Sequence, residues 1–157
     1  MKKQKGFSLI ELLIVVAIIL IIAAIAIPNL LRSRMAANEA SAVGSIRTLN
    51  TSAVTYSSTY PATGYPASLA VMGGAIPCTA LPATACLIDA VLAAGSKSGY
   101  TFTWTTDANT PSVGYSVGAN PISIGTSGQR AFFSDQSGVI RYQVTGAVAK
   151  ITDPPLQ

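Results

Sequence analysis

The hydrophobic pattern of the chain changes sharply after about the first 30 residues. Residues 7–27 are apolar or aromatic except for Ser8 and Glu11, and the last sixteen of them form an unbroken apolar run. As a helix, these 21 residues reach about 31 Å, which is the thickness of the hydrocarbon core of a bilayer. The pattern therefore predicts a membrane-spanning helix over residues 7–28.

Three lysines, Lys2, Lys3 and Lys5, precede this helix. By the positive-inside rule they stay in the cytoplasm, and the rest of the chain lies outside it. A conventional secretory signal cut near residues 24–26 fits less well, because the apolar part of such signals runs to about 7–15 residues. An ordinary single-span anchor explains the length and the orientation but gives Glu11 no role.

Residues 29–60 continue with a helical period. Apolar positions recur at steps of three and four residues, namely Val43, Ile46, Leu49 or Asn50, Ala53, Tyr56 and Tyr60. We expect the charged side chains of this stretch to face water, namely Arg32, Arg34, Glu39 and Arg47. This pattern predicts an amphipathic helical half whose apolar stripe packs on a globular domain.

Pro28 lies between the two predicted helical halves. Proline lacks the N–H that the helix needs, so we predict a kink or local melting near residues 24–28. An ordinary helix end at this point is the alternative.

Residues 61–157 are predicted to form a globular head. Prolines and glycines predict a loop over residues 61–83, and a short helix should follow from Thr84, as its N-cap, to Gly95. The segment "GSKSG" after it indicates a turn, because it lacks the full spacing of a phosphate-binding loop.

Four strand-like segments come next, at residues 100–106, 114–118, 130–134 and 139–144. The first alternates aromatic residues with threonines, and "DQSG" predicts a hairpin turn between the last two. The C-terminal "DPPLQ" should be a tail outside the sheet. Helices followed by strands favour an α+β fold, in which a long helical spine packs on an antiparallel sheet of about four strands.

Composition and charge exclude several functions. The chain has 10 Lys and Arg against 6 Asp and Glu, but three of the positive charges precede the apolar run, so no basic stripe for nucleic acid remains. No histidine is present, which removes the commonest general base and the commonest metal ligand. We therefore predict no enzyme activity, no metal site and no cofactor.

Cys78 and Cys86 are the two cysteines of the chain. They are too few for a zinc site without histidine partners. A local disulfide and a pair of buried free thiols are both open, and an oxidising compartment favours the disulfide.

Glu11 is the residue that a simple membrane span does not explain. An acid at the centre of a bilayer costs about 2.5–3.5 kcal/mol on insertion-based scales. Ser8 and Glu11 have the spacing of a capping box, in which the two residues satisfy exposed amides at the start of a helix. This local role is sufficient to place an acid there, and it is one of two hypotheses for Glu11.

The segment "KGFSLIELLIVVAIILIIAAIAIPNL" resembles the N-termini of type IV pilins and of the related pseudopilins of type II secretion systems. The shared pattern is a short basic leader that ends in Gly6, followed by Phe7, a small hydroxyl residue, an apolar pair and Glu11. Pilins also have a proline at the place of Pro28. The resemblance is close over about the first 35 residues.

The resemblance implies how the chain is processed and assembled. A prepilin peptidase removes the leader, residues 1–6, by cutting between Gly6 and Phe7, and the new amine of Phe7 is methylated. In the filament, this amine pairs with Glu11 of a neighbouring subunit. An unpaired charge in an apolar helix bundle is heavily penalised, so the pair would set the axial register.

The resemblance also implies partners. They are like subunits in a homopolymer, membrane lipid before assembly, the prepilin peptidase, and an assembly ATPase with its inner-membrane platform. The chain is then a single-pass inner-membrane protein whose head lies outside the cytoplasm, and later a periplasmic or cell-surface filament.

Two other functions remain as alternatives. A pseudopilin is the closer one, although the acidic calcium-binding loop of many major pseudopilins has no counterpart among the residues of the C-terminal half. A monomeric, membrane-anchored periplasmic binding domain is the other, with a pocket on the face formed by Tyr100, Phe102 and Trp104.

Overall fold

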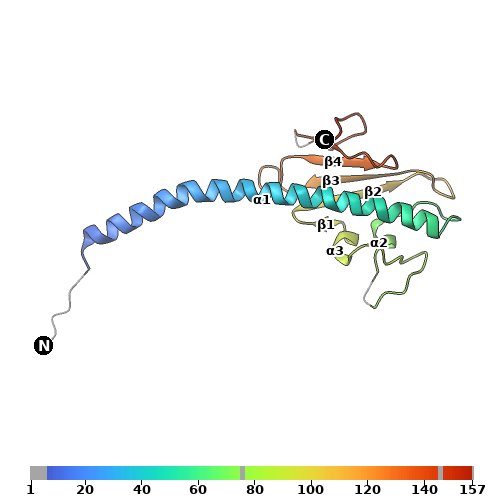
Figure 1. The fold of residues 1–157 in the computed structure, drawn as a ribbon, viewed down its shortest axis with the longest axis horizontal. Helices are drawn as coiled ribbons and strands as arrows, with labels where there is room; N and C mark the ends of the chain where they lie inside the picture. The colour runs from blue at the N-terminus through green and yellow to red at the C-terminus, as the bar shows by residue number, and fades with distance from the viewer. Residues whose placement is uncertain (1–6, 75–76, 145–146, 157) are drawn as a thin grey trace. The chain divides into compact units, whose positions relative to one another are not determined.

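The computed structural model of the chain describes residues 7–74, 77–144 and 147–156. The predicted leader, with its lysines and Gly6, lies outside the described residues. The chain forms two compact units, Met1–Arg34 and Met35–Gln157. Helix α1, Leu9–Thr59, begins in the first unit and ends in the second (Figure 1).

The described part of the first unit consists of Phe7, Ser8 and the first 26 residues of α1. In residues 7–34, every side chain is exposed except that of Ala23, which is half-buried. The apolar part of α1 is long and apolar enough to cross a membrane. An apolar surface that the chain itself does not cover needs lipid or protein around it.

Pro28 lies inside α1, and residues 24–28 are all helical. The predicted local melting and the alternative of a helix end are therefore wrong. A proline inside a helix removes one backbone hydrogen bond, and here the residues on both sides of Pro28 keep the helical conformation. A kink at Pro28 stays a prediction.

In the second unit, the strands form one antiparallel sheet in the order β1-β2-β3-β4-β5 (Figure 1). The strands are β1 Ser96–Lys97, β2 Tyr100–Thr106, β3 Tyr115–Pro121, β4 Ala131–Asp135 and β5 Arg141–Gln143. Each strand pairs with the next along the chain, so the sheet is a simple meander. The predicted α+β fold is confirmed, with five strands where about four were expected.

The turns of the sheet follow the residues that occupy them. Ser98 and Gly99 adopt positive φ angles of 50° and 75° in the tight turn between β1 and β2, where "GSKSG" predicted a turn. Between β4 and β5, Gly138 has φ 74°, and its N–H donates to the carbonyl oxygen of Asp135 at 2.9 Å. This is the hairpin turn that "DQSG" predicted.

The C-terminal tail lies beside β5 and is hydrogen-bonded to it. The N–H of Tyr142 donates to the carbonyl of Pro154, and the N–H of Leu156 donates to the carbonyl of Ile140. The tail forms an isolated bridge with β5 and no strand of its own. The expectation of a non-strand tail is correct, but the tail is bound to the edge of the sheet.

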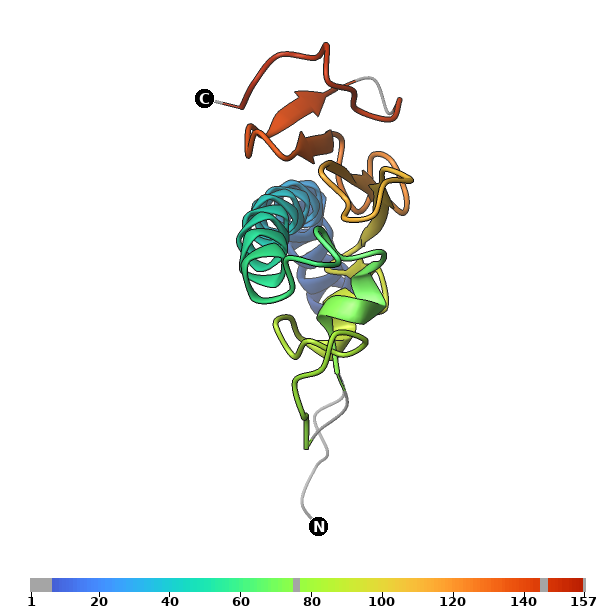
Figure 2. The ribbon, with the colours of Figure 1, turned by 90° about the vertical axis from the view of Figure 1, so that its right-hand side faces the viewer.

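The core lies between α1 and the sheet. Figure 2 shows the turns of α1 beside the strands. The buried cluster consists of Ala42, Val43, Ile46 and Leu49 of α1 with Leu69, Met72, Ile88, Leu92, Tyr100, Phe102, Val117, Ala119, Phe132 and Ile140. The predicted apolar stripe of residues 29–60 therefore packs on the head, as expected.

Two short helices lie between α1 and the sheet in sequence. Helix α2, Leu69–Met72, forms inside the stretch predicted as a loop. Helix α3 is Ala90–Ala93, and Asp89, not Thr84, is its N-cap, because the Asp89 carboxylate accepts the N–H of Leu92 at 2.9 Å. The predicted helix from Thr84 therefore begins too early, although Gly95 does follow its end, with φ 77°.

Candidate functional site

The start of α1 brings Ser8 and Glu11 together. The backbone N–H of Ser8 donates to Oε2 of Glu11 at 2.9 Å, and the N–H of Leu12 donates to the carbonyl of Ser8 at 3.2 Å. This is the backbone half of a capping box, in which an acid in the first turn satisfies an amide that has no partner in the helix. Of the two carboxylate oxygens, Oε2 is the one with a hydrogen-bond partner among the described residues.

The surroundings of Glu11 are apolar and uncovered. Leu9, Ile10, Leu12 and Leu13 are all between 57% and 73% exposed. A carboxylate on such a surface enters an apolar environment as soon as lipid or another helix covers the surface. A cation held by the covering partner would then offset the cost of burying the charge.

Phe7 lies just before the helix and is exposed. It is four residues before Glu11, so the two belong to the same end of the chain. The pairing of Glu11 with the amine of another subunit's Phe7, and the cut after Gly6, stay predictions.

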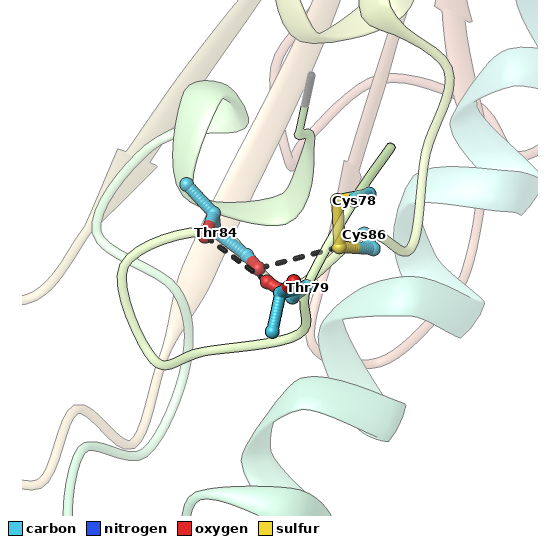
Figure 3. The surroundings of a disulfide bond; sticks show 4 residues. All are labelled: Cys78, Thr79, Thr84 and Cys86. Carbon is cyan, nitrogen blue, oxygen red and sulfur yellow. Dashed lines mark hydrogen bonds between the residues drawn. A yellow bond between two sulfur atoms is a disulfide. The ribbon is translucent and has the colours of Figure 1, made fainter. Parts of the chain in front are cut away.

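Cys78 and Cys86 form a disulfide at the base of a short hairpin (Figure 3). Within the hairpin, the backbones of Leu81 and Thr84 exchange two hydrogen bonds of 3.0 Å. The hydroxyl of Tyr56 donates to the carbonyl of Pro82 at 2.7 Å and so ties the hairpin to α1. The disulfide closes a surface loop that the head holds in place.

Glu39 is a residue that the sequence analysis placed on the wrong side of α1. It was expected to face water, but it is only 8% exposed. Its Oε1 accepts the N–H groups of Gln129 and Arg130, and its Oε2 lies 2.7 Å from Nε of Arg130. Burial alone would raise the pKa of Glu39, but these hydrogen bonds and the Arg130 charge outweigh it and hold the pKa below its ordinary value.

The spacing of the sequence contains a signal for the position of Glu39. It lies three and four residues before Ala42 and Val43, in phase with the apolar stripe of α1. An acid in the phase of a buried stripe indicates a buried partner. Here the partner is Arg130, whose guanidinium also lies over the rings of Phe132 and Tyr142 at 5.6 and 5.8 Å.

Asn50 is a second polar tie between α1 and the sheet. Its Nδ2 donates to Oγ of Ser134 at 2.9 Å, and its Oδ1 accepts the hydroxyl of Tyr115 at 3.1 Å. The sequence left Leu49 and Asn50 as alternatives for one position of the stripe. The structure uses both, since Leu49 is buried in the core and Asn50 is half-buried beside it.

The strand face proposed for a binding pocket is filled by the core. Tyr100 and Phe102 are buried. Trp104 stacks on Tyr115 with ring centroids 4.6 Å apart, and its Nε1 donates to the carbonyl of Pro66. Among the described residues, no three His, Cys, Asp or Glu side chains are grouped so that they could hold a metal ion.

Comparison with known proteins places the N-terminal segment. Residues 1–27 match the model of the prokaryotic N-terminal methylation motif. The chain carries this methylation motif. The resemblance that rests on Phe7, Ser8 and Glu11 is thereby confirmed.

One relative extends the comparison beyond the methylation motif. Over 39 residues the chain is 64% identical to the type IV wide pilus major component PilA4 of Thermus thermophilus. Over this segment the chain is a homologue of that type IV pilin. The match covers 25% of this chain and 30% of the relative, so the chain spans less than a third of the curated relative it matches. No solved structure matches the chain.

Proposed function

We propose that the chain is a structural subunit of a type IV pilin-like filament, without catalytic activity, which polymerises through helix α1. One observation carries this proposal. The methylation motif of residues 1–27 includes the start of α1, where the apolar side chains are exposed. Glu11 is the single acid among them. The homology with a major pilus component supports it.

The first proposed step is processing. A prepilin peptidase removes residues 1–6, and methylation follows on the amine of Phe7. A free α-amine has an ordinary pKa of about 7.7–8.0, so it is largely cationic at neutral pH. The chain thereby gains a positive charge four residues before Glu11.

The second step is storage in the inner membrane. Residues 7–28 span the bilayer, residues 29–60 continue the helix and the head lies outside the cytoplasm. Lipid covers the apolar surface that the chain leaves exposed. Glu11 lies near one end of this segment, where its carboxylate keeps the Ser8 amide as a partner.

The third step is assembly, in which like helices replace lipid around α1. This exchange moves apolar side chains from one apolar environment to another, so the hydrophobic effect contributes little to it. Close packing and the ion pair of Glu11 with a neighbour's Phe7 amine then determine the register. An assembly ATPase and an inner-membrane platform supply the work, and the product is an open, non-closing fibre.

Mass spectrometry of the mature N-terminus tests the processing. We expect a chain that begins at Phe7 and carries one added methyl group on its amine. An intact Met1, or a start near Ile27, would overturn the filament proposal, because both leave the chain without the required amine.

Substitutions of Glu11 test the assembly. In Glu11→Gln the amide oxygen can still accept the Ser8 N–H, but the uncharged side chain cannot form an ion pair. We expect processed, membrane-inserted Glu11→Gln protein with a filament yield at least about tenfold lower, since about 1.4 kcal/mol per subunit contact is a factor of ten. A normal yield from Glu11→Gln would assign Glu11 to helix capping alone.

The location of the filament distinguishes a pilin from a pseudopilin. Surface filaments on cells that express the chain support the pilin. Loss of protein secretion upon deletion of the gene, without surface filaments in the parent strain, supports the pseudopilin.

A further inference from the structure

The loop between β3 and β4 exposes two large aliphatic side chains. In residues 122–128, which we call the apolar loop, Ile122 and Ile124 are 62% and 60% exposed. Single exposed aliphatic residues are common on protein surfaces. Two exposed isoleucines within three positions of one loop form a small apolar patch.

Hydrogen bonds within the apolar loop fix its shape. The N–H of Ser127 donates to the carbonyl of Ser123 at 2.8 Å, and the N–H of Gly125 donates to the carbonyl of Gly128 at 2.9 Å. The N–H of Ile122 donates to the carbonyl of Gly99 at 3.0 Å. Because its backbone is held in this way, the loop does not turn its isoleucines inward, and their exposure is a stable property of the surface.

The apolar loop lies at the end of the second unit where α1 enters it. Nδ2 of Asn38 donates to the carbonyl of Ser127 at 2.9 Å, and Asn38 is the fourth residue of this unit. The next residues after the loop, Gln129 and Arg130, bind Glu39. Both ties therefore hold the loop beside the first turns of α1 that belong to the second unit.

The sheet register gives a matched site at the opposite end. Tyr100 pairs with Pro121, directly before the apolar loop, whereas Thr106 pairs with Tyr115 at the other end of the same two strands. Seven residues of extended strand separate the two ends by about 20 Å. Val113, which is 68% exposed, lies just before Tyr115 in the chain and serves as the reference position.

The chain distance to the membrane-spanning segment is short. Ten residues lead from Pro28 to Asn38, and along a helix they rise about 15 Å. Leu30 and Leu31 extend the apolar run beyond Pro28, and a tilted helix can draw them toward the hydrocarbon. Asn38 follows Leu31 by seven residues of α1, which is about 10 Å of helical rise.

The charges along this part of the chain suit an anionic surface. No acid occurs between Asp107 and Asp135 in the chain, and the carboxylate of Glu39, which lies beside the end of the apolar loop, is paired with Arg130. Arg32 and Arg34 lie in the stretch that leads from the apolar run to Asn38. Arginines next to a bilayer are attracted by anionic headgroups.

We propose that the apolar loop is a lipid contact of the unassembled subunit, with Ile122 and Ile124 inserted among the headgroups of an anionic bilayer. The proposal rests on the membrane-stored stage of the proposed function. It adds a second attachment, so that the head is held against the membrane and not only tethered to it. Assembly breaks this contact when the subunit leaves the bilayer.

Fluorescence quenching by lipid tests the contact in the full-length, processed chain. Ile124→Trp and Val113→Trp are each reconstituted in phosphatidylglycerol and phosphatidylcholine vesicles that contain a headgroup-labelled quencher lipid. Trp104 is present in both proteins and contributes the same background. We expect the added Trp at position 124 to be quenched at least about twofold more than that at position 113, because quenching requires near contact and the two sites differ by about 20 Å.

Equal quenching of the two variants would overturn the proposal. If Ile124→Trp is quenched as strongly in vesicles of pure phosphatidylcholine as in the mixed vesicles, the proposed preference for an anionic bilayer is wrong, since phosphatidylcholine carries no net charge. Circular dichroism identical to that of the parent protein shows that each variant is folded.

A second pair of variants separates lipid from a neighbouring subunit as the partner. If Ile124→Trp is not quenched, but Ile124→Asp lowers filament yield more than Val113→Asp does, the loop contacts another copy of the chain and the lipid proposal is wrong. The proposed function has its own readout, the methylated Phe7 amine. If the Phe7 amine is not methylated, the quenching result still stands. If the two Trp variants are quenched equally, the filament proposal still stands.

Discussion

The two ends of helix α1 have opposite relations to the rest of the chain. From Leu9 to Arg34 the helix is apolar around most of its circumference, and the chain covers none of that surface fully. From Met35 to Thr59 the helix is amphipathic, and its buried stripe completes a conventional core. The second part of α1 thus belongs to the core of a domain, whereas the apolar surface of the first part is not covered by the chain.

The difference shows how one part of α1 can lie first in lipid and later among other helices, as the proposed function requires, while the other part stays in the core of the head. The second part is stable by its own contacts, so the head can fold when the first part is in lipid. The side chains of the first part are exposed, so in the proposed assembly this part can exchange lipid for protein without unfolding the head. The following predictions test this division, beginning with the largest expected effect.

Truncation of a leucine in each part of α1 should have very different effects. Leu49 is 0% exposed and Leu20 is 63% exposed. We expect Leu49→Ala to lower the free energy of unfolding of the head by about 2–5 kcal/mol, the range for a buried leucine. Leu20→Ala should leave it unchanged. Denaturant unfolding of the full chain in detergent, followed by near-ultraviolet circular dichroism, measures both, and similar losses would contradict the division.

Removal of the disulfide should affect the head alone. We expect Cys78→Ser with Cys86→Ser to lower the free energy of unfolding by about 2–3 kcal/mol, from the chain entropy of so short a closed loop. The same measurement on the parent protein in a reducing agent provides the control. An unfolding curve that does not respond to reductant would show that the Tyr56–Pro82 contact and its neighbours hold the hairpin without the bond.

The Glu39–Arg130 tie should make the stability of the head depend on pH. The pKa of folded Glu39 lies below its ordinary value of 4.5, so its stabilisation is complete above about pH 4.5 and is lost as the pH falls through the folded pKa. We expect Glu39→Gln to cost about 1.5–3 kcal/mol at pH 7, as the loss of a hydrogen bond to a charged group does. Thermal unfolding at pH 7 and at a series of lower pH values should show this gap and then its narrowing below about pH 4.5. A gap of constant size from pH 7 to pH 3 would contradict a role for the charge.

The smallest expected effect concerns two neighbouring hydroxyl positions on α1. Thr55 is exposed, and its hydroxyl donates to the carbonyl of Thr51 within the helix. Ser52 is buried, and its hydroxyl donates to the carbonyl of Leu87 at 3.4 Å. We expect Thr55→Ala to stabilise the head by up to about 0.5 kcal/mol through helix propensity, and Ser52→Ala to destabilise it by about 0.5–1 kcal/mol. The same sign for both would mean that the hydroxyl of Ser52 does not tie α1 to the head.

Local sequence patterns predicted the elements that depend mainly on neighbouring residues in the chain. The alternation of aromatic residues and threonines marked β2 with its observed bounds, and "DQSG" marked the turn before β5. The apolar run and the spacing of Ser8 and Glu11 marked the N-terminal site. In each case neighbouring residues carry the information, so no distant contact is needed.

The features that sequence reasoning missed depend on distant partners. Glu39 is buried because it binds Arg130 and the amides of Gln129 and Arg130, which are 90 and 91 residues away in the chain, and no local rule predicts these partners. Strand β1 is only Ser96–Lys97, too short for a period, and forms because β2 lies beside it. Helix α3 begins late because the residues before it hydrogen-bond to α2, as the N–H of Leu87 does to Met72.

The tail beside β5 has a consequence for which part of the molecule can polymerise. An exposed outer strand is a template on which further strands can add, and that is a common route to aggregation. Here the outermost backbone contains Pro154 and Pro155, which have no N–H to offer, and at the other edge β1 is only two residues long. Neither edge of the sheet is a good acceptor for another strand. In the proposed filament the heads can therefore come close together without pairing through their sheets, and the helices make the contacts that extend the filament.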